Sequence, residues 1–284
     1  MHGPQGDEKA AQMRRLKERM ERIKYKILVL SGKGGVGKST VTANLALSLA
    51  QRGFKVGILD TDLHGPNIPH MLGAQDVRLS GAEDNMEPVE LRKNLWCASL
   101  ALIGHAPDTP YVWRGPLKIA IINQLIADVN WGDLDYLIID SPPGTGDEPL
   151  TVAQTLTGSK GTVIVTTPQS VSVLDARRTL HFSKQLKTPV LGVIENMAGY
   201  LTPEGNILPL FGEGGGEQAA KEFGVPFLGR LPMDPLAVKS SEAGKGFMED
   251  SSRVELQNAF TKVVVNILKE FPPVLQGFSP LKGF

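Results

Sequence analysis

A glycine-rich stretch near the N-terminus carries residues that can bind a nucleotide. Residues 26 to 40 read KILVLSGKGGVGKST, in which Gly32, Gly37, Lys38 and Ser39 have the spacing of a phosphate-binding loop. Glycines let backbone N–H groups close around phosphate oxygens, where a Cβ atom would clash. Lys38 can reach the β- and γ-phosphates, and the Ser39 hydroxyl can ligate Mg²⁺. We predict nucleotide contacts from Gly32, Lys33, Gly34, Gly35, Val36, Gly37, Lys38, Ser39 and Thr40.

Three carboxylates follow apolar runs at points where they could serve ATP hydrolysis: Asp140 ends YLIID, Asp60 ends KVGILD, and Asp62 lies just beyond. The reaction needs charge neutralisation, Mg²⁺ and an oriented water. We expect Ser39, Asp60 and Asp140 to hold Mg²⁺, directly or through water. Lys38 would neutralise phosphate charge, and Asp62, in the loop, would lie next to the attacking water. The alternative for each aspartate is a capping role in a loop or at a helix start.

Apolar runs of strand length alternate with helical patterns along most of the chain. The expected strands are 27–30, 55–60, 95–100, 136–140, 161–167, 190–196 and 227–231. The expected helices are 7–24, 41–51, 116–129, 171–186, 217–223 and 254–271, and 200–216 is expected to be a loop. Strands that are apolar throughout predict an α/β fold, with a mostly parallel twisted sheet covered by helices on both faces. Ligands of such sheets bind at the carboxyl ends of strands, where Lys33, Asp60, Asp140 and Asn196 lie.

Composition indicates one globular domain. The chain has 284 residues, 41% of them hydrophobic, and a formal net charge of zero, which argues against a nucleic-acid partner. No apolar run of about 18 residues could span a membrane, and the charged N-terminus lacks an apolar signal core, so we expect a cytoplasmic protein without a transmembrane segment. We divide the chain into an N-terminal tail and helix (1–25), one P-loop ATPase domain (26–271) and a C-terminal tail (272–284).

Five segments of the chain together form a pattern that is typical of one family. They are GKGGVGKST, DTDLHGPN, WRGPL from Trp113 to Leu117, YLIIDSPPGTGD and VIENM. In these segments the chain resembles the Mrp/ApbC family, cytosolic ATPases of the MinD/ParA/nitrogenase-iron-protein class that are described as iron–sulfur cluster carriers. The resemblance covers roughly Lys26 to Phe247. The second lysine of the loop, Lys33, marks the deviant Walker A motif of that class.

The resemblance implies an Mg²⁺-dependent ATPase that works as a homodimer with ATP between its subunits. Lys33 matches the signature lysine that crosses the dimer interface to the other subunit's nucleotide and acts there much like an arginine finger. Asp62 lies in the segment that matches switch I, residues 140–147 match switch II, and Asn196 matches the position whose amide contacts adenine. ATP-driven closure would be coupled to cluster delivery or metallocofactor assembly on client apoproteins or an assembly partner.

The chain departs from the family in its cysteines. Members usually carry a Cys-x-x-Cys pair shortly after the ENM motif, and two pairs per dimer supply four thiolates for a bridging [4Fe–4S] cluster. In this chain the corresponding stretch, MAGYLTPEGNILPLFGEGGG, has no cysteine, and the single thiol of the sequence is Cys97. Cys97 lies in the apolar run LWCASL, where a small buried core residue is expected. This chain therefore lacks the usual thiolate ligands for binding an iron–sulfur cluster directly.

A second function class fits the same nucleotide site. Relatives such as MinD and ParA use ATP to control dimerisation and attachment, so the alternative is a nucleotide-switched positioning or scaffold ATPase. The apolar face of the helix expected at 254–271 could then be an attachment surface. We expect it instead to pack on the sheet, because Pro272 and further residues follow it.

Overall fold

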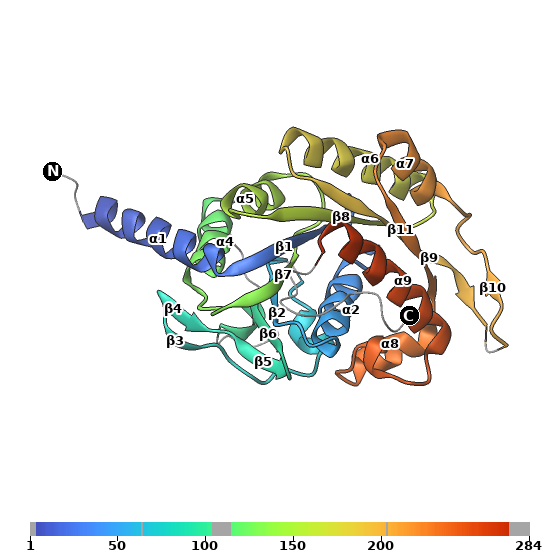
Figure 1. The fold of residues 1–284 in the computed structure, drawn as a ribbon, viewed down its shortest axis with the longest axis horizontal. Helices are drawn as coiled ribbons and strands as arrows, with labels where there is room; N and C mark the ends of the chain where they lie inside the picture. Colours follow the sequence, from blue (N-terminus) through green and yellow to red (C-terminus); the bar gives the residue numbers. More distant parts are fainter. Residues whose placement is uncertain (1–3, 64, 104–114, 203, 273–284) are drawn as a thin grey trace.

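The computed structural model describes residues 4–63, 65–103, 115–202 and 204–272, and a central sheet dominates this part of the chain (Figure 1). Its strands run in the order β10-β9-β8-β1-β7-β2-β6-β5, and β11 also pairs with β9. The strands of this sheet are β1 (Ile23–Leu30), β2 (Val56–Asp60), β5 (Val89–Arg92), β6 (Leu95–Ser99), β7 (Leu134–Asp140), β8 (Lys160–Thr166), β9 (Val190–Leu201), β10 (Ile207–Leu208) and β11 (Phe227–Met233). A separate pair is formed by β3 (Ser80–Ala82) and β4 (Asn85–Glu87).

The sheet is parallel except at its two edges, where β5 pairs antiparallel with β6 and β10 antiparallel with β9. Helices cover both faces, which confirms the predicted α/β class. They are α1 (Pro4–Glu21), α2 (Lys38–Gln51), α3 (Ile68–Met71), α4 (Gly115–Asp128), α5 (Asp147–Thr155), α6 (Ser170–Gln185), α7 (Gly215–Phe223), α8 (Pro235–Glu242) and α9 (Val254–Glu270), with short 3₁₀ turns at Leu100–Leu102 and Phe247–Glu249.

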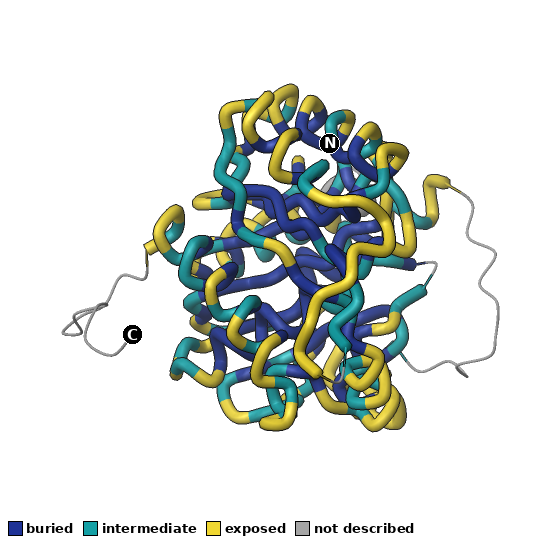
Figure 2. Tube along the Cα trace, turned by 90° about the vertical axis from the view of Figure 1, so that its right-hand side faces the viewer, coloured by how far each residue is buried: buried dark blue, intermediate teal, exposed yellow. Residues whose placement is uncertain are grey.

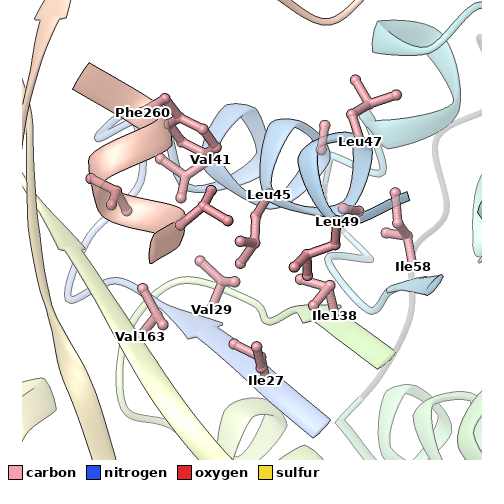
Figure 3. Packing of buried hydrophobic residues seen from close by; sticks show 14 of the residues in the cluster. Ile27, Val29, Val41, Leu45, Leu47, Leu49, Ile58, Ile138, Val163 and Phe260 are labelled. Carbon is pink, nitrogen blue, oxygen red and sulfur yellow. The ribbon is translucent and has the colours of Figure 1, made fainter. Parts of the chain in front are cut away.

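Alternate residues of β1 enter different cores, as the pleat of a strand requires. Ile27 and Val29 pack under α2 and α9, and Figure 3 shows them below Val41, Leu45 and Phe260. Leu28 and Leu30 belong to the opposite core, which α4 and α5 cover. Burial on both faces explains why this strand is apolar throughout, and the buried strands form the centre of the molecule in Figure 2.

The structure differs from the sequence-based boundaries in three places. The first helix ends at Glu21, because Ile23 already pairs with Leu134 as the first residue of β1. Part of the loop expected at 200–216 is a hairpin, in which β9 continues to Leu201 and returns as β10. Strands β3 to β5 and helices α3, α5 and α8 were not predicted, because each is too short to show a clear period.

Two segments named in the sequence analysis lie partly outside the described residues. The C-terminal tail expected at 272–284 lies outside them except for residue 272, and Trp113 of the WRGPL segment also lies outside.

The expected packing of the last helix is confirmed. Its apolar residues are buried, and α9 packs on β11. No helix among the described residues is both long and apolar enough to cross a membrane.

A buried lysine closes the junction between α1 and β1. Lys26 is 1% exposed, and its Nζ donates hydrogen bonds to the carbonyl oxygens of Met20 at 2.6 Å and Ile23 at 2.7 Å. Burial lowers the pKa of Lys26 to about 8. The ammonium group thus satisfies one carbonyl in the last turn of α1, where such groups lack partners within the helix, and one carbonyl at the start of β1.

Candidate functional site

The glycine-rich loop joins β1 to α2 at the carboxyl edge of the sheet. A Cβ atom at Gly32 would lie 2.4 Å from the backbone of Asp175 in α6, so only glycine allows this packing. Gly37 has a φ of 84° and precedes the first residue of α2. A Cβ at Gly34 or Gly35, by contrast, would meet no described atom within 4 Å. The loop is therefore tightly packed at its ends and open in its middle, where an anion could approach the backbone N–H groups.

Lys38 brings a buried positive charge to this opening. Its Nζ lies 2.8 Å from Oδ2 of Asp140 and 3.6 Å from Oδ2 of Asp62. The side chain is 6% exposed, yet its ammonium group makes no well-directed hydrogen bond to any described residue. The two carboxylates balance its charge, while the geometry leaves its N–H donors for another acceptor. A phosphate group bound in the loop would be such an acceptor.

Asp140, at the end of β7, connects the loop with the second strand of the site. Its Oδ2 accepts a hydrogen bond from the Ser39 hydroxyl at 2.6 Å, and its Oδ1 accepts one from Thr42 at 2.8 Å. Asp60 lies beside it in the register of β2 and β7. The carboxylate of Asp60 accepts hydrogen bonds from the Asp62 backbone N–H and the Ser99 hydroxyl, both at 3.1 Å.

The two neighbouring aspartates are both buried, and this affects their charge. Burial, and then the negative charge of Asp140, raise the pKa of Asp60 to about 8. No group of three or more His, Cys, Asp or Glu side chains within the described ranges is arranged to hold a metal ion by itself. Mg²⁺, however, is commonly held by one or two carboxylates together with phosphate oxygens of a substrate. The oxygens of Ser39 and Asp140, which lie 2.6 Å apart, fit a site of that kind, while the predicted metal role of Asp60 stays a prediction.

Lys33 lies at the start of the loop and is half-buried. Among the described residues its ammonium group has no ion-pair partner, while its backbone carbonyl accepts a hydrogen bond from Ser31 at 3.0 Å. The predicted action of Lys33 on the nucleotide of a second subunit stays a prediction. Lys38, Ser39, Asp60, Asp62 and Asp140 are brought together as expected, and Lys33 is on the same edge of the sheet.

Asn196 contacts the other end of the loop. Its Nδ2 donates a hydrogen bond to the Val36 carbonyl oxygen at 2.9 Å, and a Cβ at Gly37 would lie 2.2 Å from the same nitrogen. Beside it is a cavity of about 330 Å³ with a largely apolar lining, which adjoins the first turn of α2. Its walls include Gly37, Thr40, Asn67, Met71, Asn196, Met197, Leu231, Met233, Val238 and Phe247. A nucleoside attached to phosphates in the loop would fit this place.

Several residues of the site were not predicted from the sequence. Thr42 follows Lys38 by one helical turn, and this spacing is the signal that could have placed it near Asp140. Ser99 ends β6 in register with Asp60. This neighbour could be found only once the order of the strands in the sheet was known. The cavity walls from α3 and α8 had no sequence signal, because those helices are short.

Comparison with known proteins assigns the family. The sequence model described as ParA, NUBPL iron-transfer P-loop NTPase, matches residues 22–268. An iron-sulfur cluster carrier protein of Methanocaldococcus jannaschii is 48% identical over 236 residues, 83% of this chain and 81% of the relative. The cytosolic Fe-S cluster assembly factor NUBP2 of Rattus norvegicus is 44% identical, over 88% of this chain and 94% of the relative.

Solved structures agree with this assignment. A nucleotide-binding protein from Archaeoglobus fulgidus in complex with ADP has a TM-score of 0.73 and 39% identity, over 84% of this chain and 93% of that one. MinD of Pyrococcus horikoshii with Mg-ADP has a TM-score of 0.65 and covers 88% of this chain and 98% of its own. At 24% identity the second comparison shows likeness of fold alone. The chain belongs to the ParA/NUBPL family of iron-transfer P-loop NTPases.

Proposed function

We propose that this protein is a homodimeric, Mg²⁺-dependent ATPase of iron–sulfur cluster assembly. It would couple ATP-driven closure to cluster delivery or metallocofactor assembly on client proteins. The observation that carries the proposal is the buried Lys38 ammonium group, which pairs with Asp140 at 2.8 Å. The Ser39 hydroxyl binds the same carboxylate, and Asp60 lies beside Asp140 in the sheet. The names of its relatives, iron-sulfur cluster carrier and assembly factor, support the role in cluster assembly.

The residues divide the work of phosphoryl transfer between them. Lys38 would bind the β- and γ-phosphates, and the open backbone at Gly34 and Gly35 would surround their oxygens. Ser39 and Asp140, with Asp60 beside them, would hold Mg²⁺, which supplies further positive charge when it is bound. Asp62 would orient a water, whose oxygen bonds to the γ-phosphorus while the bond to the β–γ bridging oxygen breaks. The products are ADP and phosphate.

Lys33 would complete the site from a second subunit. Its ammonium group has no ion-pair partner within the described ranges, so it is available for an interaction outside its own chain. A cation delivered across the interface would stabilise charge that develops on the phosphoryl oxygens in the transition state. Hydrolysis would therefore depend on closure of the dimer, which is the step that could be linked to a client.

The cluster itself would be held with ligands from another molecule. Cys97 is completely buried in β6, and no cluster of metal-ligating side chains exists among the described residues. The β9–β10 hairpin, which projects at the edge of the molecule in Figure 1, is a candidate surface for protein contacts. Ile207, Leu208 and Leu210 there are each more than half exposed. We propose the cytosol as location, following the name of the NUBP2 relatives.

The alternative of a positioning ATPase anchored by its last helix finds no support in α9, because its apolar face is buried.

The proposal is tested by two assays on the same preparation. ATP hydrolysis should require Mg²⁺ and disappear in Lys38→Ala, and unaltered turnover in that variant would refute the site. Anaerobic reconstitution with iron and sulfide should leave no [4Fe–4S] absorbance on the purified protein alone. A bound cluster of about one per dimer would contradict the proposed external ligands.

A further inference from the structure

Glu195 precedes Asn196 in β9 and is completely buried. Its Oε1 accepts hydrogen bonds from the Gly214 backbone N–H at 3.2 Å and from Nε of Arg230 at 3.1 Å. Its Oε2 accepts one from the Gly216 backbone N–H at 2.7 Å. A carboxylate is tolerated in a protein interior when donors of this kind surround it. Glu195 is therefore fixed in position by three groups from two other elements, α7 and β11.

The glycines that bind Glu195 form the start of α7. Gly214 is the N-cap, with a φ of 77°, and a Cβ at Gly216 would lie 3.1 Å from the Glu195 Cβ. The N-terminus of a helix favours an anion, and here the carboxylate takes that place. The contact pins β9 against α7.

The following residue of the strand reaches in the other direction. Asn196 donates to the Val36 carbonyl oxygen, and a side chain at Gly37 would collide with it. Adjacent residues of β9 thus each bind the backbone of a different glycine-rich turn. Met197 comes next with a φ of 56°, a left-handed conformation that is uncommon for a residue with a side chain. Asn196 and Met197 both line the 330 Å³ cavity.

We propose that Glu195 is a positioning residue for recognition of the nucleoside. By pinning β9 to α7, it holds Asn196 and the unusual backbone of Met197 at the cavity wall. The inference rests on the proposed ATPase function and adds that the base of ATP binds in this cavity, beside Asn196. Glu195 makes no contact with the residues that bind phosphate, Lys38 and Ser39, so its loss should affect the nucleoside and spare the phosphates.

The test compares two probes, ADP and inorganic tripolyphosphate, by calorimetric titration. Glu195→Ala should weaken ADP binding about tenfold, the value of one good hydrogen bond, and change tripolyphosphate binding by less than about twofold. Glu195→Gln, which keeps one oxygen acceptor, should show a smaller loss for ADP alone. The matched control is Glu222→Ala in α7, whose side chain pairs with Arg177 at 2.8 Å on the surface. It should change neither affinity.

A double-mutant cycle shows whether Glu195 acts through its neighbour. In the Asn196→Ala background, Glu195→Ala should cause a clearly smaller loss of ADP affinity than in the wild type, because one of the two groups that it positions is already gone and only Met197 remains. Full additivity of the two losses would overturn the proposal. Equal losses for ADP and tripolyphosphate would also overturn it, since they would show general damage to the fold. If unfolding of Glu195→Ala is not cooperative, ADP and tripolyphosphate binding are compared in Glu195→Gln in its place.

Failure of the inference can be told from failure of the proposed function. If the wild-type protein does not bind ADP, both the proposed function and the inference are refuted. A wild-type protein that binds ADP, with a selective loss in Asn196→Ala and none in either Glu195 variant, would remove the inference alone.

Discussion

The buried ion pair between Lys38 and Asp140 predicts a large loss of stability in Asp140→Asn. The two groups lie 2.8 Å apart, and their side chains are 6% and 1% exposed. Asparagine keeps the shape of the side chain but removes its charge. The Lys38 ammonium would then be left with the Asp62 carboxylate, at 3.6 Å, as its ion-pair partner among the described residues.

The expected size follows from two opposing effects. Removal of one partner from a buried ion pair costs about 3–5 kcal/mol of unfolding free energy. The same substitution also removes the negative charge that raises the pKa of Asp60, so the Asp60 carboxyl, which is largely protonated at pH 7, ionises more readily and partly replaces the lost charge. We therefore expect the lower end, about 3 kcal/mol, or a fall in Tm on the order of 6–10 °C for a domain of this size.

Thermal and urea unfolding of the nucleotide-free protein at pH 7 measure this effect. The control is Asp133→Asn, because Asp133 pairs with Arg22 at 2.9 Å while their side chains are 74% and 50% exposed. An exposed pair of that kind contributes little to stability, because solvent and salt screen it. The double variant Lys38→Met/Asp140→Asn should recover most of the lost stability, since no unpaired buried charge remains. A Tm for Asp140→Asn that matches the control would refute the reasoning.

Further predictions concern the second lysine, the loop and the α1–β1 junction. Lys33→Ala should leave ADP affinity within about twofold and lower kcat at least tenfold, because it acts only in the transition state; an unchanged kcat would reject this role. Gly37→Ala should cost about 2–3 kcal/mol in urea unfolding, because φ is 84° and the new Cβ would meet Asn196, and an unchanged midpoint would contradict it. Lys26 has a folded pKa of about 8, below its unfolded value of 10.5. Below pH 8 the folded state therefore carries the full cost of burying the charged ammonium group, and this cost disappears as pH rises from 8 toward 10.5. The stability of wild type relative to Lys26→Met should rise by up to about 3 kcal/mol over that window, and a constant difference in urea unfolding at pH 8 and pH 10 would refute the shift.

The phosphate loop could be predicted because its chemistry is local. Gly37, Lys38 and Ser39 are consecutive, and the loop needs only the strand before it and the helix after it. Asp60 and Asp140 could be placed near it, because the carboxyl ends of parallel strands meet at one edge of the sheet. The raised pKa of Asp60 could not be predicted, because it depends on the pairing of β2 with β7 and on complete burial.

Features that depend on distant contacts were less predictable. Asn196 and Val36 are 160 positions apart, and their hydrogen bond depends on how β9 and the loop approach each other. The binding of Glu195 by Gly214 and Gly216 likewise needs the return of the chain from β10 to α7. Helix α8 has no buried residue, so it leaves no apolar period in the sequence although it lines the cavity.

The central claim is that each ATP is hydrolysed at a site shared by two subunits, and mixed dimers test it most directly. Lys33→Ala should bind ATP without supplying the crossing lysine, and Lys38→Ala should supply that lysine without binding ATP. Lys33→Ala alone should keep at most about a tenth of the wild-type rate, and Lys38→Ala alone should be inactive. After subunit exchange, an equimolar mixture should regain roughly a quarter of the wild-type rate, because half of the randomly paired dimers are mixed and one of their two sites is complete. A mixture no more active than the sum of its separate variants would contradict the shared site.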